Sequence, residues 1–545
     1  MGKHLRSGWV AVALFLLLAL AILFGIRGVS AAGKQPSGPD RFAVILQNYT
    51  SFEWWLTSYG DNKVDCSIVI DHDGLPTGGE IFDTCGQDIY NQWILTDPCS
   101  SKGECDGFYL QLAKAEPAQR KVAVKQPPPE VWVTLEGCEP YKSTFRCDTL
   151  PTLVLTGEEP LDGEHITGLE GDADGKPFTC DAVCRVDLVV TSDTGLNLEF
   201  WANSSYGDSS DIFQARVRVA RSADPSDQYW YVDVLSTQWR GDTLAGCSQI
   251  WNKFPTVGGE PEWLTTPQRP EDLATSVSYE YLAANLIRYG VADASSCSDG
   301  GLQANGLASV CGLESSRPAV NDWQNHFDNL IFTAAQQTGV PAPLLKRIFA
   351  RESQFWPGHA DDHPEAGLGQ MTDGGADTVF TWNPSFYEQF CPSVLDQSVC
   401  KTKIYPLPEA GWEGIGLAQT ERSILRNALV NSVDAICPEC TMGIDLAKAD
   451  SSVAVFAQTM VASCMQAGKV LDMNYHSAPS EAATFEDLWR FTLVDYNAGP
   501  GCLGLAVDQT NNMGEPLDWE HLSSHLTPAC QGALNYVNEI SRSSP

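Results

Sequence analysis

A glutamate near the end of a predicted amphipathic helix is the residue best placed for acid–base chemistry. Apolar residues recur at helical spacing between Pro341 and Pro357: Leu344, Leu345, Ile348 and Phe349. Glu352 continues this spacing, so we expect its carboxyl on the apolar face, where burial disfavours the charged form and raises the pKa. Such a carboxyl can serve as the general acid of glycoside cleavage near neutral pH. The alternative interpretation is a helix-end glutamate paired with Arg347 or Arg351.

Three short blocks in the same half of the chain carry the other candidate residues. Glu352-Ser353 is followed by Gly367-Leu368-Gly369-Gln370, then by Tyr496-Asn497-Ala498-Gly499-Pro500-Gly501, then by Asn535-Tyr536-Val537. Their order, and the separation of Glu352 from Gln370, resemble the soluble lytic transglycosylase domain, a relative of goose-type lysozyme. The resemblance covers roughly residues 320 to 545.

The resemblance implies a role for each matched residue. Glu352 would protonate the glycosidic oxygen and then act as the base, with no cofactor and no metal. Attack by the sugar's own C6 hydroxyl would give an anhydro product. Ser353, Gln370 and Asn497 would hold Glu352 and the substrate's N-acetyl group, and Tyr496 would offer its hydroxyl near the acid. The residues matched to substrate-binding positions are Ser353, Gln370, Tyr496, Asn497 and Tyr536.

Departures from the family pattern leave other interpretations open. Gly369 stands where the family has Met, Pro364-Glu365 replaces a Gly-Ala pair, and Asp495 replaces Ala. A second carboxylate would make the enzyme a hydrolase, and the candidates are Asp361, Asp362, Glu365, Asp373 and Asp377. The tyrosines could instead be packing residues, and Gln370 and Asn497 could cap backbone groups in turns.

The first 32 residues have the pattern of a targeting segment. A basic start precedes an unbroken apolar run from Trp9 to Phe24, and Val29-Ser30-Ala31 resembles a cleavage site. We expect the rest to be exported, either anchored by residues 8–26 or released after cleavage near Ala31. Membrane contact is expected only through this segment. Residues 33–40 form a short polar linker.

Eighteen cysteines follow the targeting segment. An even number in an exported chain predicts disulfides, with pairings that the sequence leaves open. Cys180-x-x-x-Cys184 and Cys437-x-x-Cys440 also fit metal-ligand spacing, but few histidines accompany them and export favours oxidation.

The region before residue 256 has the alternation typical of β-strands. It divides near Pro127-Pro128-Pro129 into a β module at 41–126 and a β-sandwich module at 130–255, which we expect to be Ig-like. Predicted strands are 131–135, 153–155, 185–190, 196–201, 215–219 and 229–234. Six tryptophans are expected mainly in the cores, with carbohydrate stacking as the alternative: Trp54, Trp55, Trp93, Trp132, Trp201 and Trp230.

The pattern becomes helical after a Pro- and Gly-rich linker at 256–275. Helices are predicted at 279–289, 323–338, 413–433, 452–471, 485–495 and 531–541, with Asn321 or Asp322 capping the second of them. We expect residues 276–545 to form a mostly α-helical, lysozyme-like transglycosylase domain.

The net charge of the chain limits the kinds of molecule that it is expected to bind. The formal net charge of −35 argues against nucleic acid as a partner but not against a polysaccharide. The sequence therefore predicts an exported peptidoglycan lytic transglycosylase that cleaves β-1,4 bonds between N-acetylmuramic acid and N-acetylglucosamine. The alternatives are a goose-type muramidase or chitin-directed hydrolase, and a non-catalytic glycan-binding surface protein.

Overall fold

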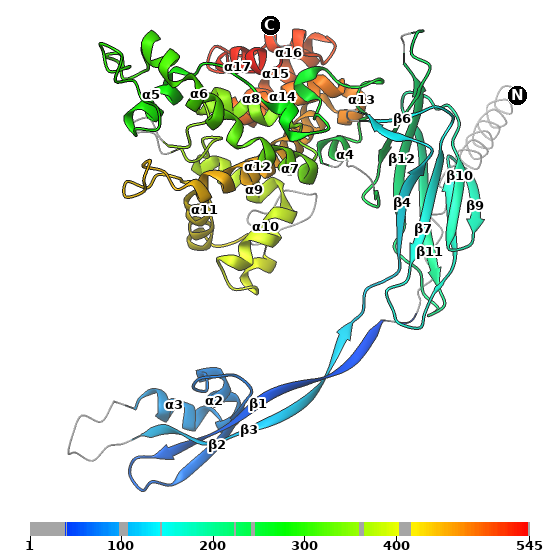
Figure 1. Cartoon of the computed structure of the whole chain (residues 1–545). Helices are drawn as coiled ribbons and strands as arrows, with labels where there is room; N and C mark the ends of the chain where they lie inside the picture. Colours follow the sequence, from blue (N-terminus) through cyan, green and yellow to red (C-terminus); the bar gives the residue numbers. More distant parts are fainter. Residues whose placement is uncertain are drawn as a thin grey trace, which may run out of the picture. The chain divides into compact units, whose positions relative to one another are not determined.

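The computed structural model describes residues 39, 41–96, 107–141, 144–222, 225–240, 246–358, 365–402 and 416–542. These residues form two compact units. The first contains the described residues up to Pro129 together with Glu159–His165 and Ser204–Ser209. The second contains Glu130–Glu158, Ile166–Asn203 and the described residues from Ser210 onward. The described chain is rich in β-strands before residue 236 and helical after it, as predicted (Figure 1).

The first unit is built on a three-stranded antiparallel sheet of order β2-β1-β3. Its strands are β1 (Phe42–Ser58), β2 (Val64–Ile70) and β3 (Phe108–Lys125). β1 and β3 pair along their whole length, from Phe42 opposite Lys125 to Ser58 opposite Phe108. β2 pairs only with the second half of β1, so the other half of the β1–β3 pair is a two-stranded ribbon (Figure 1).

Two helices occur where the sequence analysis predicts only strands. They are α2 (Gly78–Cys85) and α3 (Gln87–Ile94). Thr77 and Glu80 form a capping box at the start of α2, a signal that was present in the sequence as Thr-x-x-Glu. Ile81 of α2 is buried against the sheet, and a disulfide joins Cys66 of β2 to Cys85. The module at 41–126 is therefore a small mixed α/β structure and not a sandwich.

Arg41 precedes β1 and anchors the end of the ribbon where Phe42 pairs with Lys125. Its guanidinium donates to both carboxylate oxygens of Glu159, at 2.7 and 2.8 Å, and to Asp208 at 2.5 and 2.8 Å. Burial opposes the charge on Glu159, but hydrogen bonds from Arg41 and Ser204 outweigh it and lower the pKa of Glu159 to about 2. Because the pair is buried, loss of one partner would leave an uncompensated charge, which costs about 3–5 kcal/mol.

The β part of the second unit consists of two sheets around one apolar core. The smaller sheet has the order β10 (Val183–Asp187), β7 (Thr152–Glu158), β4 (Glu130–Glu136). The larger has the order β5 (Glu139–Tyr141), β6 (Thr144–Cys147), β13 (Trp230–Leu235), β12 (Phe213–Arg221), β11 (Leu196–Ser204), β8 (Ile166–Ala173), β9 (Lys176–Cys180). Alternate residues of both sheets, such as Val133, Leu155 and Val217, are fully buried. Five of the six strands predicted in this region are confirmed, and the sixth, 185–190, is a strand only as far as Asp187 of β10.

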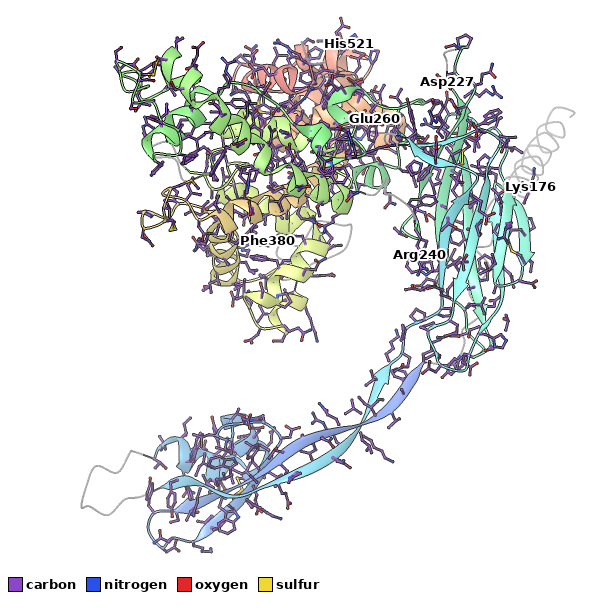
Figure 2. The ribbon with its side chains drawn as sticks, in the orientation of Figure 1. Lys176, Asp227, Arg240, Glu260, Phe380 and His521 are labelled. Carbon is purple, nitrogen blue, oxygen red and sulfur yellow. A yellow bond between two sulfur atoms is a disulfide. The ribbon has the colours of Figure 1, made fainter. Side chains whose placement is uncertain are left out.

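Three of the six tryptophans expected mainly in the β cores pack against a core while only partly buried: Trp54 and Trp93 in the first unit and Trp230 in the second. Trp55 is 37% exposed. The Arg240 guanidinium, labelled in Figure 2, lies 4.0 Å from the ring centroid of Trp132, and Arg221 lies 4.1 Å from that of Trp230. Aliphatic residues and the rings of Phe145 and Phe200 fill the core between the two sheets, and the indoles of Trp132 and Trp230 lie against arginines.

The helical part packs around one long helix, α12 (Leu446–Tyr475). The other helices before it are α4 (Cys247–Trp251), α5 (Glu280–Arg288), α6 (Val310–His326), α7 (Asp328–Thr338), α8 (Ala342–Glu352), α9 (Asp373–Trp382), α10 (Pro384–Phe390) and α11 (Gln419–Val433). Those after it are α13 (Pro479–Ala482), α14 (Phe485–Ala498), α15 (Pro500–Met513), α16 (Trp519–Ser524) and α17 (Gly532–Ile540). Short 3-10 helices occur at Glu262–Leu264, Pro270–Leu273, Cys391–Ser393 and Val399–Lys401.

Several helix boundaries differ from those predicted: α12 extends beyond the predicted 452–471 at both ends, and α11 begins at Gln419 and not at 413. The helix expected at 323–338 is two helices that meet at Phe327, and Asn321 and Asp322 lie inside α6, whose N-cap is Ser309. α6 contains Pro318 in its interior. The expected turn at Tyr496 is also helical, because α14 continues to Ala498 and ends only at Gly499, where φ is +85°.

α9 to α11 form a second, smaller core beside the main one. Phe380, labelled in Figure 2, packs there against Phe386, Tyr387 and Phe390. Leu425 and Leu429 of α11 close the cluster and are fully buried. The long segment between Thr372 and Asp495 thus has its own small core. The same segment includes α12, which lines the candidate site described below.

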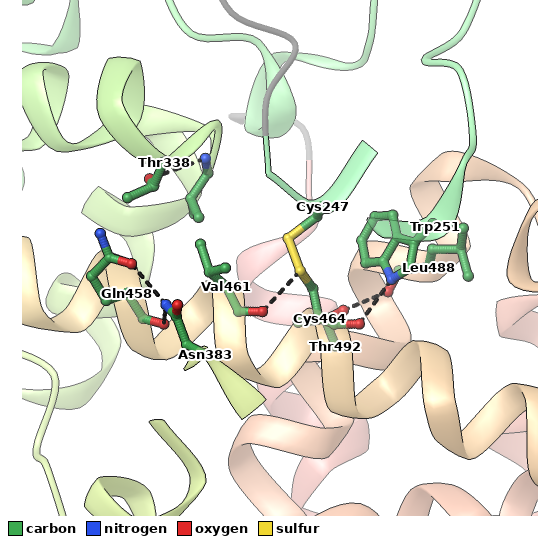
Figure 3. The surroundings of a disulfide bond; sticks show 10 residues. Cys247, Trp251, Thr338, Asn383, Gln458, Val461, Cys464, Leu488 and Thr492 are labelled. Carbon is green, nitrogen blue, oxygen red and sulfur yellow. Dashed lines mark hydrogen bonds between the residues drawn. A yellow bond between two sulfur atoms is a disulfide. The ribbon is translucent and has the colours of Figure 1, made fainter. Parts of the chain in front are cut away.

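The sixteen cysteines in the described part of the chain form eight disulfides, as the sequence predicts. The two cysteine pairs with metal-ligand spacing are bonded internally, Cys180 to Cys184 and Cys437 to Cys440. Cys247 bonds to Cys464 of α12 across 217 residues (Figure 3). This bond ties the end of the β region to the centre of the helical core.

No described helix has the length and apolar character needed to cross a membrane. The targeting segment predicted at residues 1–32 lies outside the described residues.

Candidate active site

Glu352 is the last residue of α8, as the apolar spacing predicts. Leu344, Leu345, Ile348 and Phe349 on the inner face of this helix are all fully buried. The Glu352 side chain is half-buried, and this burial raises the pKa of its carboxyl. The charge of Glu365 raises the pKa further, whereas Tyr536 and Arg351 oppose the rise. The position thus has the property that a general acid needs.

The two arginines considered as partners of Glu352 make other contacts. Arg351 Nε lies 2.7 Å from Glu539 Oε2, and Arg347 donates to the carbonyl of Ile540 at 2.8 Å. Glu352 Oε1 instead accepts a hydrogen bond from the Tyr536 hydroxyl at 2.6 Å. The phenol of Tyr536 is neutral, unlike an arginine guanidinium, so it can orient the Glu352 carboxyl without requiring that carboxyl to be ionised.

Ser353 and Tyr496 fix the turn that carries Gln370. The Ser353 hydroxyl oxygen lies 2.9 Å from the carbonyl oxygen of Leu368 and 3.1 Å from that of Phe349, and its single proton is shared between these two acceptors. The Tyr496 hydroxyl donates to the carbonyl of Gly369 at 2.6 Å. The hydroxyl that reaches the acid therefore belongs to Tyr536, and the one predicted to lie there, that of Tyr496, binds the turn.

Gln370 contacts its own turn. It has a φ of +50°, and its side-chain Nε2 donates to the carbonyl of Gly367 at 2.8 Å. This is the turn-capping interaction considered as the alternative for this residue. The side chain also lines the cavity described next.

A cavity of about 390 Å³ brings together four of the six predicted site residues: Glu352, Gln370, Tyr496 and Asn497. The other two, Ser353 and Tyr536, are 5% and 3% exposed and contact the cavity-lining segments through their hydroxyls. The volume suits part of an oligosaccharide and lies within the range of ligand sites.

Gly369 explains one departure from the family pattern. A Cβ at this position would lie 2.0 Å from the Phe456 ring of α12. The Phe456 ring packs edge-on against Tyr496, with centroids 5.4 Å apart. The aromatic ring thus occupies the space that a larger residue 369 would need, and only glycine fits beside it.

Of the five acids considered as a second carboxylate, Glu365 lines the cavity. Asp373 and Asp377 contact Arg426, at 3.8 and 2.5 Å respectively. Asp361 and Asp362 lie outside the described residues.

α12 provides a wall of the cavity that was not predicted from the sequence. Four residues on one face of α12 line the cavity: Phe456, Thr459, Ser463 and Gln466. Their spacing of three and four residues was readable as a helix face, but nothing in the sequence linked that face to Glu352. Asp495 of α14 lines the same cavity and was noted only as a departure from the family.

No protein-family model, curated protein or solved structure matches this chain.

Proposed function

We propose that the protein is an exported lytic transglycosylase that cleaves the β-1,4 bonds of peptidoglycan glycan strands. The observation that carries the proposal is Glu352, a half-buried carboxyl with a raised pKa at the wall of a cavity, oriented by the Tyr536 hydroxyl. In this proposal the helical part has a lysozyme-like fold and the two-sheet part is an Ig-like sandwich. The first unit and the sandwich would position the catalytic domain or attach it to glycan.

The reaction needs one group that is first an acid and then a base. Protonated Glu352 gives its proton to the glycosidic oxygen while the bond from that oxygen to the anomeric carbon breaks. The resulting carboxylate then takes the proton of the C6 hydroxyl as its oxygen bonds to the anomeric carbon. The proton on Glu352 is restored, and the product carries a 1,6-anhydro ring.

Mass spectrometry of digested peptidoglycan tests this function. Anhydro ends would support a transglycosylase, reducing ends would show a hydrolase, and intact strands would show a non-catalytic protein. Proteins purified under oxidising conditions are needed, because all eight described disulfides lie within the folded parts.

Glu365 favours hydrolysis as the second candidate function. It lines the same cavity as Glu352, and its charge acts on Glu352. A second carboxylate in the cavity could activate water, as in two-carboxylate glycosidases. Glu365→Gln would then abolish cleavage, whereas the single-acid reaction leaves the anhydro product and most of the rate.

Tyr536→Phe is expected to move the alkaline limb of kcat/KM to higher pH. The hydrogen bond from Tyr536 favours the ionised form of Glu352, so its loss raises the pKa of Glu352 above the wild-type value. A general acid is active below its pKa and inactive above it, so activity should persist to higher pH. The pH profile of cleavage measures this shift.

Tyr496→Phe is the matched control for Tyr536→Phe. It removes a buried tyrosine hydroxyl that binds the carbonyl of Gly369 and not the acid. Its alkaline limb should stay at the wild-type position, even if the rate falls. A Tyr536→Phe profile that is unshifted or shifted to lower pH would contradict the assigned contact.

A further inference from the structure

Asp495 is a buried carboxyl at the cavity that the proposed mechanism does not use. It lies in α14 directly before Tyr496, lines the cavity, and is only 3% exposed. Its Oδ1 atom is buried and has no hydrogen-bond partner among the described residues. An unpaired buried polar atom is costly, so its retention beside a cavity points to a ligand.

The surroundings of Asp495 favour a neutral carboxyl. The described residues that line the cavity include three carboxyl groups, those of Glu352, Glu365 and Asp495, and no Lys, Arg or His. An ionised carboxylate buried without a cation would carry a large desolvation cost. Burial accordingly raises the pKa of Asp495 well above its ordinary value.

Gln466 determines which carboxyl oxygen carries the proton. With its amide oxygen toward Trp382 Nε1 at 2.9 Å, its amide nitrogen donates to Asp495 Oδ2 at 3.2 Å. Oδ2 therefore acts as the acceptor, and the proton belongs on Oδ1. Oδ1–H is then a donor that lacks an acceptor among the residues that the structure describes.

We propose that Asp495 is a specificity-determining residue whose neutral carboxyl donates a hydrogen bond from Oδ1 to the acetamido carbonyl of the bound glycan. This inference rests on the proposed function, because it takes the ligand to be an N-acetylated sugar. Thr459 and Ser463 also line the cavity with hydroxyls, and the Thr459 hydroxyl donates to the carbonyl of Val455 at 3.1 Å, so its oxygen is left as an acceptor. Asp495 supplies the fixed donor, and an amide carbonyl is the strongest neutral acceptor that such a sugar offers.

Two substitutions separate a neutral donor from an ionised carboxylate. Asp495→Asn keeps an acceptor for Gln466 and places an N–H donor where Oδ1–H lies, so kcat/KM should stay within about threefold of wild type. Asp495→Leu keeps the volume but removes the donor, so KM should rise on the order of tenfold with a smaller change in kcat. Loss of activity in Asp495→Asn equal to that in Asp495→Leu would overturn the proposal.

The substrate partner is tested with N-acetylated glycan and with the same glycan after chemical de-N-acetylation. Removing the acetyl group should cost the wild type about the same factor as Asp495→Leu, and should cost Asp495→Leu little more. Equal losses from Asp495→Leu on both substrates would show that the acetamido group is not the partner.

Two measurements keep this test separate from the proposed function and from misfolding. If the wild type cleaves neither glycan, calorimetric binding of an N-acetylglucosamine oligomer to wild type and both variants tests Asp495 alone. Infrared difference spectra of wild type against Asp495→Asn at neutral pH should show the carbonyl band of a protonated acid. Absence of that band would overturn the proposal, whether or not Asp495→Leu folds.

Discussion

Glu352→Gln is expected to lower the rate of glycan cleavage by roughly a thousandfold or more, the scale of losing a positioned general acid. Gln has the same shape, and its side-chain oxygen can still accept from Tyr536, so the fold should survive. The variant cannot give a proton to the glycosidic oxygen. Release of soluble fragments from peptidoglycan, followed over a long time course, measures the loss.

Glu365→Gln is the matched control, since it removes a carboxylate from the same cavity. A loss confined to Glu352→Gln identifies the acid, and equal losses in both variants indicate the two-carboxylate hydrolase. Clearance of peptidoglycan by purified Glu352→Gln at nearly the wild-type rate would refute the assignment.

Removing the Cys247–Cys464 disulfide by replacing both cysteines with Ala is expected to lower the free energy of unfolding by about 4–5 kcal/mol. The bond closes a loop of 217 residues, and in the chain-entropy model long loops give the largest stabilisation. It also holds Trp251, whose Nε1 donates to the carbonyl of Cys464 at 2.9 Å (Figure 3). The Trp251 ring packs against Trp489 and Phe485. Denaturant unfolding under oxidising conditions measures the change.

The control is replacement of Cys437 and Cys440 by Ala, because that bond spans only three residues. Its expected cost is about 2 kcal/mol or less. Similar losses in both double variants would show that loop closure is not the source of the stability.

This disulfide also changes where an independently folding helical fragment should begin. A fragment starting near Pro270 would lose Cys247, Trp251 and Trp263, all buried in the helical core. A fragment starting at Gly246 keeps all three. We therefore expect only the longer fragment to cleave short glycan fragments after oxidative refolding.

The sequence alone determined the local features of this protein. The amphipathic spacing of α8 placed Glu352 on a buried face, and alternation predicted the sandwich strands, because both patterns are set by the geometry of one element. The cysteine content predicted disulfides, since paired thiols and an export signal point to oxidation. The helices α2 and α3 were missed although Thr77 and Glu80 carried a local signal.

Only the tertiary structure decided which distant residues meet. Tyr536 approaches Glu352 across 184 residues, and Tyr496 reaches the carbonyl of Gly369 across 127. No local pattern encodes such distances, because they depend on how α14 and α17 pack beside α8 and α12. The same holds for Asp495, whose burial beside the cavity follows from the packing of α14 on α12 and could not be read from its own segment.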